Sequence, residues 1–255
     1  MAISEKTTEE IKLMRESGII AGETLRLVSG YLTAGISSKE LDEIAERYIR
    51  NQKAEPAFLG YRGYPASLCV SINEEIVHGI PKPGRILKKG DVVSLDVGVF
   101  KNGFYSDTAA TFVVEKNDNP VVNKLIETTK KALYESIKFA VAGRNLYDIS
   151  FAIQSIAESS GFSVVKDYTG HGIGKKLHEE PFVLNYVPNI MMRRRGQILK
   201  KGYALAIEPM LNMGRSETQV LSDNWTVATK DRKISAHFEH TVAITDGKPV
   251  ILTEV

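Results

Sequence analysis

The sequence predicts an α/β (α+β) fold in which a central, mainly antiparallel sheet is covered on one face by two pairs of helices. Two stretches with helical apolar spacing open the chain, and two more follow Pro120. Apolar runs of strand character come after each pair, and Asn102-Gly103 joins two of these runs as a predicted hairpin. This order is typical of a layered domain with its core between the helices and the sheet.

The first half begins with two amphipathic helices. Over residues 8–28, apolar residues recur at spacings of three and four, which makes one apolar stripe. Thr7 with Glu10 offers a capping box at the start of this helix, and Ser37 with Glu40 offers another for a second helix. The second helix is expected to bury Leu41, Ile44, Ala45, Tyr48 and Ile49.

The second half repeats this order, which indicates an internal duplication. Ala34-Gly35 stands before the second helix of one half, and Ala142-Gly143 stands before the second helix of the other. The halves would span about residues 8–115 and 120–250. We expect them to form a single catalytic domain over residues 1–255, because no linker or low-complexity tract divides the chain.

The strands repeat as well. Leu87-Lys88-Lys89-Gly90 leads into an apolar run that ends at Asp96, and Leu199-Lys200-Lys201-Gly202 leads into a run that ends at Glu208. A carboxylate therefore ends the corresponding strand in each half. A pseudo-two-fold axis between the halves would bring the two carboxylates together.

The predicted hairpin places a second acid beside Asp96. A two-residue turn at Asn102-Gly103 puts Asp96 opposite Ala109, and Asp107 then lies diagonally across the ladder on the same face. Diagonal neighbours are roughly 7–8 Å apart. Two inward-facing carboxylates at this separation suit metal ions about 3.5–4 Å apart.

Burial favours a metal site over surface charge for these acids. Asp96 and Glu208 stand in apolar runs, and an unpaired buried carboxylate is very costly. The alternative is a buried ion pair with a lysine or arginine from elsewhere in the fold. Glu239 in the predicted strand 235–244 and His171 in a glycine-rich segment complete the candidate ligand set. That segment lacks the residues of a phosphate-binding loop.

Composition narrows the class of protein further. The chain is 43% hydrophobic and 25% charged, with a net charge of +2, so it gives no case for a membrane or a specific nucleic acid as partner. Cys69 is the single cysteine, so no intrachain disulfide can form. No apolar signal segment opens the chain, and no run approaches the roughly 20 apolar residues of a membrane span. We expect a cytoplasmic protein.

From about Lys12 onward the chain closely resembles the type I methionine aminopeptidases, which are metallopeptidases with the pita-bread fold. Any one of the shared motifs is weak, whereas the ordered set is specific. The motifs are Gly60-Tyr61-Arg62-Gly63-Tyr64-Pro65, Ser71-Ile72-Asn73-Glu74, Val77-His78-Gly79-Ile80-Pro81, Ser94-Leu95-Asp96-Val97-Gly98, Asp107-Thr108-Ala109, Gly170-His171-Gly172-Ile173-Gly174, Ile207-Glu208-Pro209-Met210, Trp225-Thr226 and Glu239-His240-Thr241.

The resemblance implies a hydrolase that removes the initiator methionine from nascent proteins whose second residue is small. Two divalent ions (Co, Mn, Fe or Zn) would be held by Asp96, Asp107, His171, Glu208 and Glu239, and a water bridging them would attack the scissile carbonyl. Glu208 would relay the proton, His178 would hydrogen-bond the carbonyl, and His78 would contact the scissile amide.

The same resemblance implies an apolar, aromatic pocket for the methionine side chain. Tyr61, Tyr64, Cys69 and Trp225 would line it, together with His78 and His178. Cys69 also has the simpler interpretation of a small core residue. Family members often carry cysteine at Phe58, histidine at Arg62 and phenylalanine near Leu177, so these three positions alter the expected pocket mouth.

Two further features are open. The basic run Arg193-Arg194-Arg195 is typical of solvated surface, and a transient contact with the ribosome is a hypothesis for it. Asn73 and Ser235 are candidates to hold a monovalent cation, and the family suggests a monomer. The rival functions are an X-Pro peptidase of the same fold, which usually carries an extra N-terminal domain, and a metal-free binding module.

Overall fold

The computed structural model describes residues 3–255, apart from the side chains at 190 and 192. Its helices and strands follow one another in this order: α1 Thr8–Ser29, α2 Ser38–Asn51, β1 Glu55–Pro56, η1 Tyr61–Gly63, β2 Cys69–Ile72, β3 Glu75–Val77, β4 Val92–Lys101, β5 Phe104–Val113, α3 Pro120–Ile137, α4 Leu146–Ser159, β6 Ser163–Val164, β7 Gly170–Gly172, β8 Glu179–Val183, η2 Ile190–Arg195, β9 Ala204–Ile207, β10 Met210–Asn212, β11 Thr218–Val220, β12 Val227–Thr229, β13 Ser235–His237, β14 Glu239–Ala243 and β15 Val250–Ile251.

A nine-stranded sheet forms the centre of the molecule, in the order β1-β4-β5-β14-β9-β7-β8, with β2 beside β4 and β15 beside β14. Every strand pair described in it is antiparallel. Two three-stranded sheets, β13-β10-β6 and β11-β12-β3, complete the strands of residues 3–255. The predicted α/β class with a mainly antiparallel sheet is confirmed.

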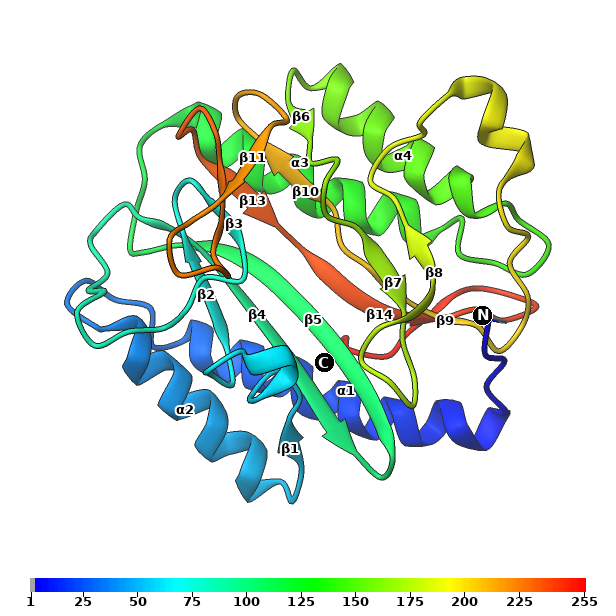
Figure 1. Cartoon of the computed structure of the whole chain (residues 1–255), viewed down its shortest axis with the longest axis horizontal. Coiled ribbons are helices and arrows are strands. Elements are labelled where there is room, and N and C mark those ends of the chain that lie inside the picture. The colour runs from blue at the N-terminus through cyan, green and yellow to red at the C-terminus, as the bar shows by residue number, and fades with distance from the viewer. Residues whose placement is uncertain (1–2) are drawn as a thin grey trace.

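The two helix pairs cover the same face of the sheet: α1 passes behind β4 and β5 with α2 beside it, and α3 packs near β13 and β14 with α4 beside it (Figure 1). Each pair packs on its own apolar cluster, one containing Leu41 and Val97 and the other Leu125 and Leu205. Both predicted capping boxes are present. No helix in the described chain is long and apolar enough to cross a bilayer.

In each half, a matching backbone hydrogen bond joins the segment before the second helix to the segment before the acid-bearing strand. Gly35 N–H donates to Leu87 O at 2.9 Å, and Gly143 N–H donates to Leu199 O at 2.9 Å. Both glycines have positive φ, at 98° and 84°, which a residue with a Cβ rarely adopts. These bonds are what an internal duplication predicts, while the division into halves stays an interpretation.

The β4–β5 hairpin has the predicted register. Asn102 and Gly103 both have positive φ, at 50° and 84°, as a type I′ turn requires. Asp96 pairs with Ala109, and Asp107 pairs with Gly98 two positions along the ladder. Both carboxylates therefore project from one face of the sheet.

The predicted strand 235–244 is wrong in its continuity. The chain leaves β13 at His237 and enters β14 at Glu239, and these strands belong to different sheets. Phe238 N–H donates to Pro209 O at 3.3 Å at the break. The side chains on both sides of Phe238 are buried, so the apolar sequence pattern continues across this residue. The sequence therefore did not indicate that the chain passes from one sheet to another here.

Candidate metal centre and active site

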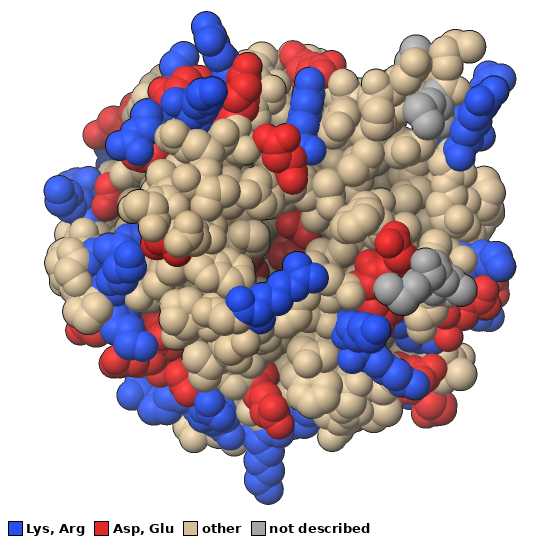
Figure 2. Space-filling model, viewed as in Figure 1, with Lys and Arg blue, Asp and Glu red and all other residues tan. Residues whose placement is uncertain are grey.

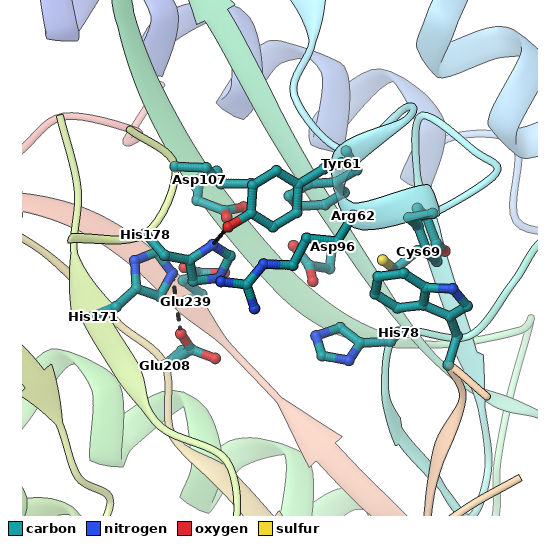
Figure 3. Close-up of a pocket in the computed structure, with 14 residues that line it drawn as sticks. Tyr61, Arg62, Cys69, His78, Asp96, Asp107, His171, His178, Glu208 and Glu239 are labelled. Atoms are coloured by element: carbon teal, nitrogen blue, oxygen red, sulfur yellow. Dashed lines mark hydrogen bonds and ion pairs between the residues drawn. The ribbon is translucent and has the colours of Figure 1, made fainter. Parts of the chain in front are cut away.

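A hollow opens on the face of the sheet opposite the helices, and acidic side chains lie at its floor (Figure 2). The side chains around it come from both halves of the chain (Figure 3). The lining residues are Phe58, Tyr61, Arg62, Tyr64, Cys69, His78, Asp96, Asp107, His171, Leu177, His178, Glu208, Trp225 and Glu239. The structure thus brings together every residue that the sequence suggested for the metal, catalytic and substrate-binding roles, although their roles remain predictions.

Five segments of the central sheet position the candidate ligands. Asp96 lies in the middle of β4, so the prediction that this acid ends its strand is wrong, and Asp107 lies in β5. Glu239 begins β14 and pairs with the same Ala109 as Asp96. Glu208 follows β9, and His171 lies in β7 opposite Ala206 of β9. Neighbouring antiparallel strands therefore carry the five side chains to one place.

Burial dominates the electrostatics of the acids. It raises the pKa of Asp96 well above the usual range, and the negative charges of Asp107 and Glu208 raise it further. Burial likewise raises the pKa of Asp107 to about 7, and it raises the pKa values of Glu208 and Glu239. Four carboxyl groups in a shared low-dielectric cavity repel one another when ionised, so the cluster favours protons or cations.

Metal cations fit this cluster better than protein cations. Within residues 3–255, no lysine or arginine forms an ion pair with any of the four acids. Asp96 Oδ1, Asp107 Oδ1 and Glu239 Oε1 are buried and have no hydrogen-bond partner in the described part of the chain. One ligand atom from each of Asp107, His171 and Glu239 lies within 4.8 Å of the others. The alternative of a buried lysine or arginine ion pair is therefore wrong for the described structure.

The backbone fixes the proton position on His171. Its Nδ1 lies 2.8 Å from Gly172 O, and a carbonyl oxygen can only accept, so Nδ1 carries the hydrogen. Nε2 then keeps its lone pair and lies 3.6 Å from Glu208 Oε1. Burial lowers the pKa of His171 to about 3, so the ring is neutral at pH 7. A neutral imidazole with a free Nε2 is the form that binds a metal.

His178 and His78 face the cavity from two loops. His178 Nδ1 lies 2.8 Å from the Tyr61 hydroxyl, and its ring centroid lies 4.1 Å from that of His171. Burial, followed by the positive charge of Arg62, lowers the pKa of His178 to about 4. Burial also lowers the pKa of His78 to about 4, and its backbone has a φ of 60°. Both rings are therefore neutral hydrogen-bonding groups at pH 7.

An aromatic wall stands beside the acids. The Tyr64 ring meets the Trp225 ring edge-on, with 5.1 Å between their centroids, and the Phe58 ring lies 6.5 Å from Tyr64. Cys69 is buried against this wall, and burial raises its pKa well above the usual range. The thiol is thus uncharged at neutral pH, and the wall presents an apolar surface of the kind that a thioether contacts favourably.

Sequence reasoning missed His237. Its side chain is 1% exposed, both ring nitrogens lack a hydrogen-bond partner among the described residues, and Nε2 lies 3.9 Å from Glu208 Oε2. Burial lowers its pKa to about 3, so the ring is neutral. The sequence could have indicated that His237 lies near the acids, because it stands two residues before Glu239 in the same apolar run.

The two remaining candidate features lie outside the cavity. Asn73 O accepts the Ser235 N–H at 3.0 Å, so these residues are adjacent, and Asn73 also bonds Asp91 and Val92 through its side chain. Arg193 pairs at 3.0 Å with Asp148, which lies in the first turn of α4.

A family model for the metallopeptidases of family M24 matches residues 12–246. The chain therefore belongs to metallopeptidase family M24 and is a metal-dependent hydrolase. Methionine aminopeptidase of Escherichia coli (strain K12) is 46% identical over 256 residues, which cover 99% of this chain and 94% of that protein. Methionine aminopeptidase 1 of Bacillus subtilis (strain 168) is 48% identical over 250 residues, with 98% of both chains covered. Within the family, the chain belongs with the methionine aminopeptidases.

Solved structures agree with this grouping. The crystal structure of methionine aminopeptidase from Thermotoga maritima superposes with a TM-score of 0.95 at 39% identity and covers all of both chains. Prolidase from Pyrococcus furiosus has a TM-score of 0.79 at 22% identity, and this chain covers 65% of it. The prolidase likeness shows the shared pita-bread fold alone.

Proposed function

We propose that this protein removes the initiator methionine from nascent proteins whose second residue is small. The observation that carries the proposal is the juxtaposition of a buried four-carboxylate cluster, a neutral His171 and an aromatic wall in one cavity. The acids suit cations, and the wall suits a thioether side chain. We place this activity in the cytoplasm, because nascent chains are made in that compartment. We also propose that the protein acts as a monomer.

The candidate ligands divide between two cation positions. Asp96 would serve one position and His171 with Glu208 the other, while Asp107 and Glu239 would serve both. Divalent ions bound there would supply an acidified water and would polarise the scissile carbonyl. Carboxylates and one imidazole suit Mn, Fe, Co or Zn, and ligand type does not choose among them.

His178 has the placement of a donor to the scissile carbonyl. When the Tyr61 hydroxyl donates to Nδ1, the neutral ring carries its remaining hydrogen on Nε2, which is then free for the substrate. A donor held in this way stabilises negative charge that develops on the carbonyl oxygen. Glu208 is the group we assign to pass a proton to the leaving amine, and His78 would contact the scissile amide.

Peptide cleavage distinguishes this function from its rivals. We expect the metal-loaded protein to release methionine from Met-Ala-Ser and to leave Ala-Pro-Ala intact. EDTA should abolish the activity, and Mn²⁺ or Co²⁺ should restore it. Cleavage of Ala-Pro-Ala in preference to Met-Ala-Ser would favour an X-Pro peptidase, and no cleavage of either peptide by metal-loaded protein would favour a binding module.

A ribosome contact through Arg194 and Arg195 is a further proposal. Both side chains are exposed, whereas Arg193 is engaged by Asp148 and lies over the Phe151 ring. Exposed arginines can bind the phosphates of ribosomal RNA. We expect Arg194→Glu with Arg195→Glu to weaken co-sedimentation with ribosomes at low salt, and unchanged co-sedimentation would reject the contact.

A further inference from the structure

We propose that Arg62 makes this enzyme prefer substrates with an acidic third residue, an inference that rests on the proposed function. Arg62 is exposed, and its side chain reaches from the Gly60–Tyr64 turn towards His178 and the carboxylates (Figure 3). It lines both the cavity and a neighbouring groove. The groove residues are Ser4, Arg62, Lys176, His178, Glu179, Glu180 and Phe182.

Arg62 is an uncompensated charge at a fixed position. Within residues 3–255, no carboxylate lies within ion-pair distance of Arg62, and its guanidinium carbon lies 5.4 Å from the centre of the Tyr61 ring. Its backbone has a φ of 49°, between Gly60 at 82° and Gly63 at 89°. Gly60 N–H donates to Tyr64 O at 2.8 Å and closes the turn. The turn therefore holds the arginine at the mouth of the cavity.

The charged groups around the groove other than Arg62 balance one another. The Lys6 ammonium neutralises Glu179 at 2.7 Å, and Glu180 offsets the charge of Lys176. The charge left over is that of Arg62. A free cation at this entrance opposes the cationic amino terminus of every substrate, and an acidic side chain on the substrate would offset that repulsion.

The groove has the direction that the cleaved chain needs. We place the first side chain of the substrate against Tyr64 and Trp225 and the scissile carbonyl at His178. The peptide then leaves the cavity past Arg62 and His178, the two residues that line both the cavity and the groove. Side chains of an extended peptide alternate in direction, so the third points to the same side as the first, roughly 7 Å further on. That side is formed by the turn that carries both Tyr64 and Arg62. Phe182, 63% exposed in the groove, offers apolar surface to the following residues.

Three peptides test this preference: Met-Ala-Glu-Ser-amide, Met-Ala-Gln-Ser-amide and Met-Ala-Lys-Ser-amide. The amide removes the carboxylate of the C-terminus, which Arg62 could also bind. We expect kcat/KM of the metal-loaded enzyme to be about 2- to 5-fold higher for Glu than for Gln at low salt, the range typical of exposed ion pairs. The ratio should approach one at 1 M salt, where the screening length is about 3 Å. The Lys peptide should be the poorest substrate.

Arg62→Gln should bring the Glu-to-Gln ratio to about one, and Arg62→Glu should invert it. Lys175→Gln is the matched control, because Lys175 lies on the adjacent loop, pairs with Glu10 at 2.7 Å and is outside the groove. It should keep the original ratio. A ratio of one in the unaltered enzyme, or a ratio that survives Arg62→Gln, overturns the inference. Failure to cut even the Gln peptide would overturn the proposed function and this inference together, whereas equal cleavage of Glu and Gln peptides overturns the inference alone.

Discussion

Lys6 and Glu179 form an ion pair with 2.7 Å between Nζ and Oε2, although they lie 173 positions apart in the sequence. Their side chains are 3% and 12% exposed. Glu179 directly follows His178, and its second oxygen accepts the Lys176 N–H at 3.1 Å. The segment before α1 therefore fastens the loop that presents His178 to the cavity.

Lys6→Met should destabilise the protein and lower its activity together. The substitution leaves the Glu179 carboxylate buried without its partner, a change that costs about 3–5 kcal/mol at comparable sites. Urea unfolding of metal-loaded protein measures the loss. Adding Glu179→Gln to Lys6→Met removes the stranded charge and should recover part of the stability. If Lys6→Met alone were as stable as the original protein, the ion pair would not contribute to stability as proposed.

Metal-free protein should lose stability as the pH rises. Burial raises the pKa of Asp107 from 3.8 to about 7, so folding favours the protonated form. Stability from this group is full below about pH 4 and is lost as pH rises towards 7. We expect the melting temperature of metal-free protein to fall between about pH 6.5 and pH 8, where the buried histidines are neutral in both the folded and the unfolded chain and no longer oppose the trend. The raised pKa values of Asp96, Glu208 and Glu239 act in the same direction as that of Asp107.

Asp107→Asn checks the origin of that pH dependence. The amide cannot ionise, so metal-free Asp107→Asn should melt above the metal-free original at pH 7.5 and depend less on pH. Calorimetry in the presence of EDTA makes the comparison. A metal-free original whose melting temperature rises over this interval would contradict the assignment of the raised pKa.

His171→Ala and His178→Ala should separate metal binding from catalysis. The two rings share the cavity, with 4.1 Å between their centroids, yet only His171 has an Nε2 freed by a backbone bond at Nδ1. We expect His171→Ala to weaken metal affinity at least tenfold in a calorimetric titration. His178→Ala should retain metal affinity and lose roughly 100-fold or more in kcat, as oxyanion donors do. If His178→Ala lost metal affinity and His171→Ala lost only kcat, the assignment of the metal ligand and the carbonyl donor would be reversed.

Tyr61→Phe should reduce kcat with little effect on metal content. The variant removes the hydroxyl that lies 2.8 Å from His178 Nδ1, so the ring loses the partner that orients it. A decrease of about tenfold is the size expected for a lost orienting hydrogen bond. Tyr105→Phe is the control, because the Tyr105 ring packs on Phe100 away from the cavity. Equal activity of the two variants would show that Tyr61 does not orient His178.

Local signals in the sequence were sufficient for much of the fold. The capping boxes at Thr7 and Ser37 and the turn at Asn102-Gly103 involve residues a few positions apart, so short-range chemistry determines them. The turn at Asn102-Gly103 also sets which residues of β4 and β5 face each other. The candidate acids could be predicted because a carboxylate inside an apolar run is an anomaly that the order of residues alone reveals.

Other features needed the tertiary structure. Asp42 is buried beneath the backbone of Ser67 and Leu68 and accepts both of their N–H groups, and nothing in the α2 sequence indicates that contact. The orphaned ring of His237 and the break at Phe238 depend on which sheet each strand joins.

The sequence by itself determined the helices, the hairpin register and the inventory of acids and histidines. Only the tertiary structure decided that Asp96, Asp107, His171, Glu208 and Glu239 share one cavity, and that within residues 3–255 these acids have no lysine or arginine partner and Arg62 has no carboxylate partner at the cavity mouth. The physical reason is that capping and turn formation depend on neighbours along the chain. The pairing of charges depends instead on which distant segments the packed sheet brings within a few ångströms.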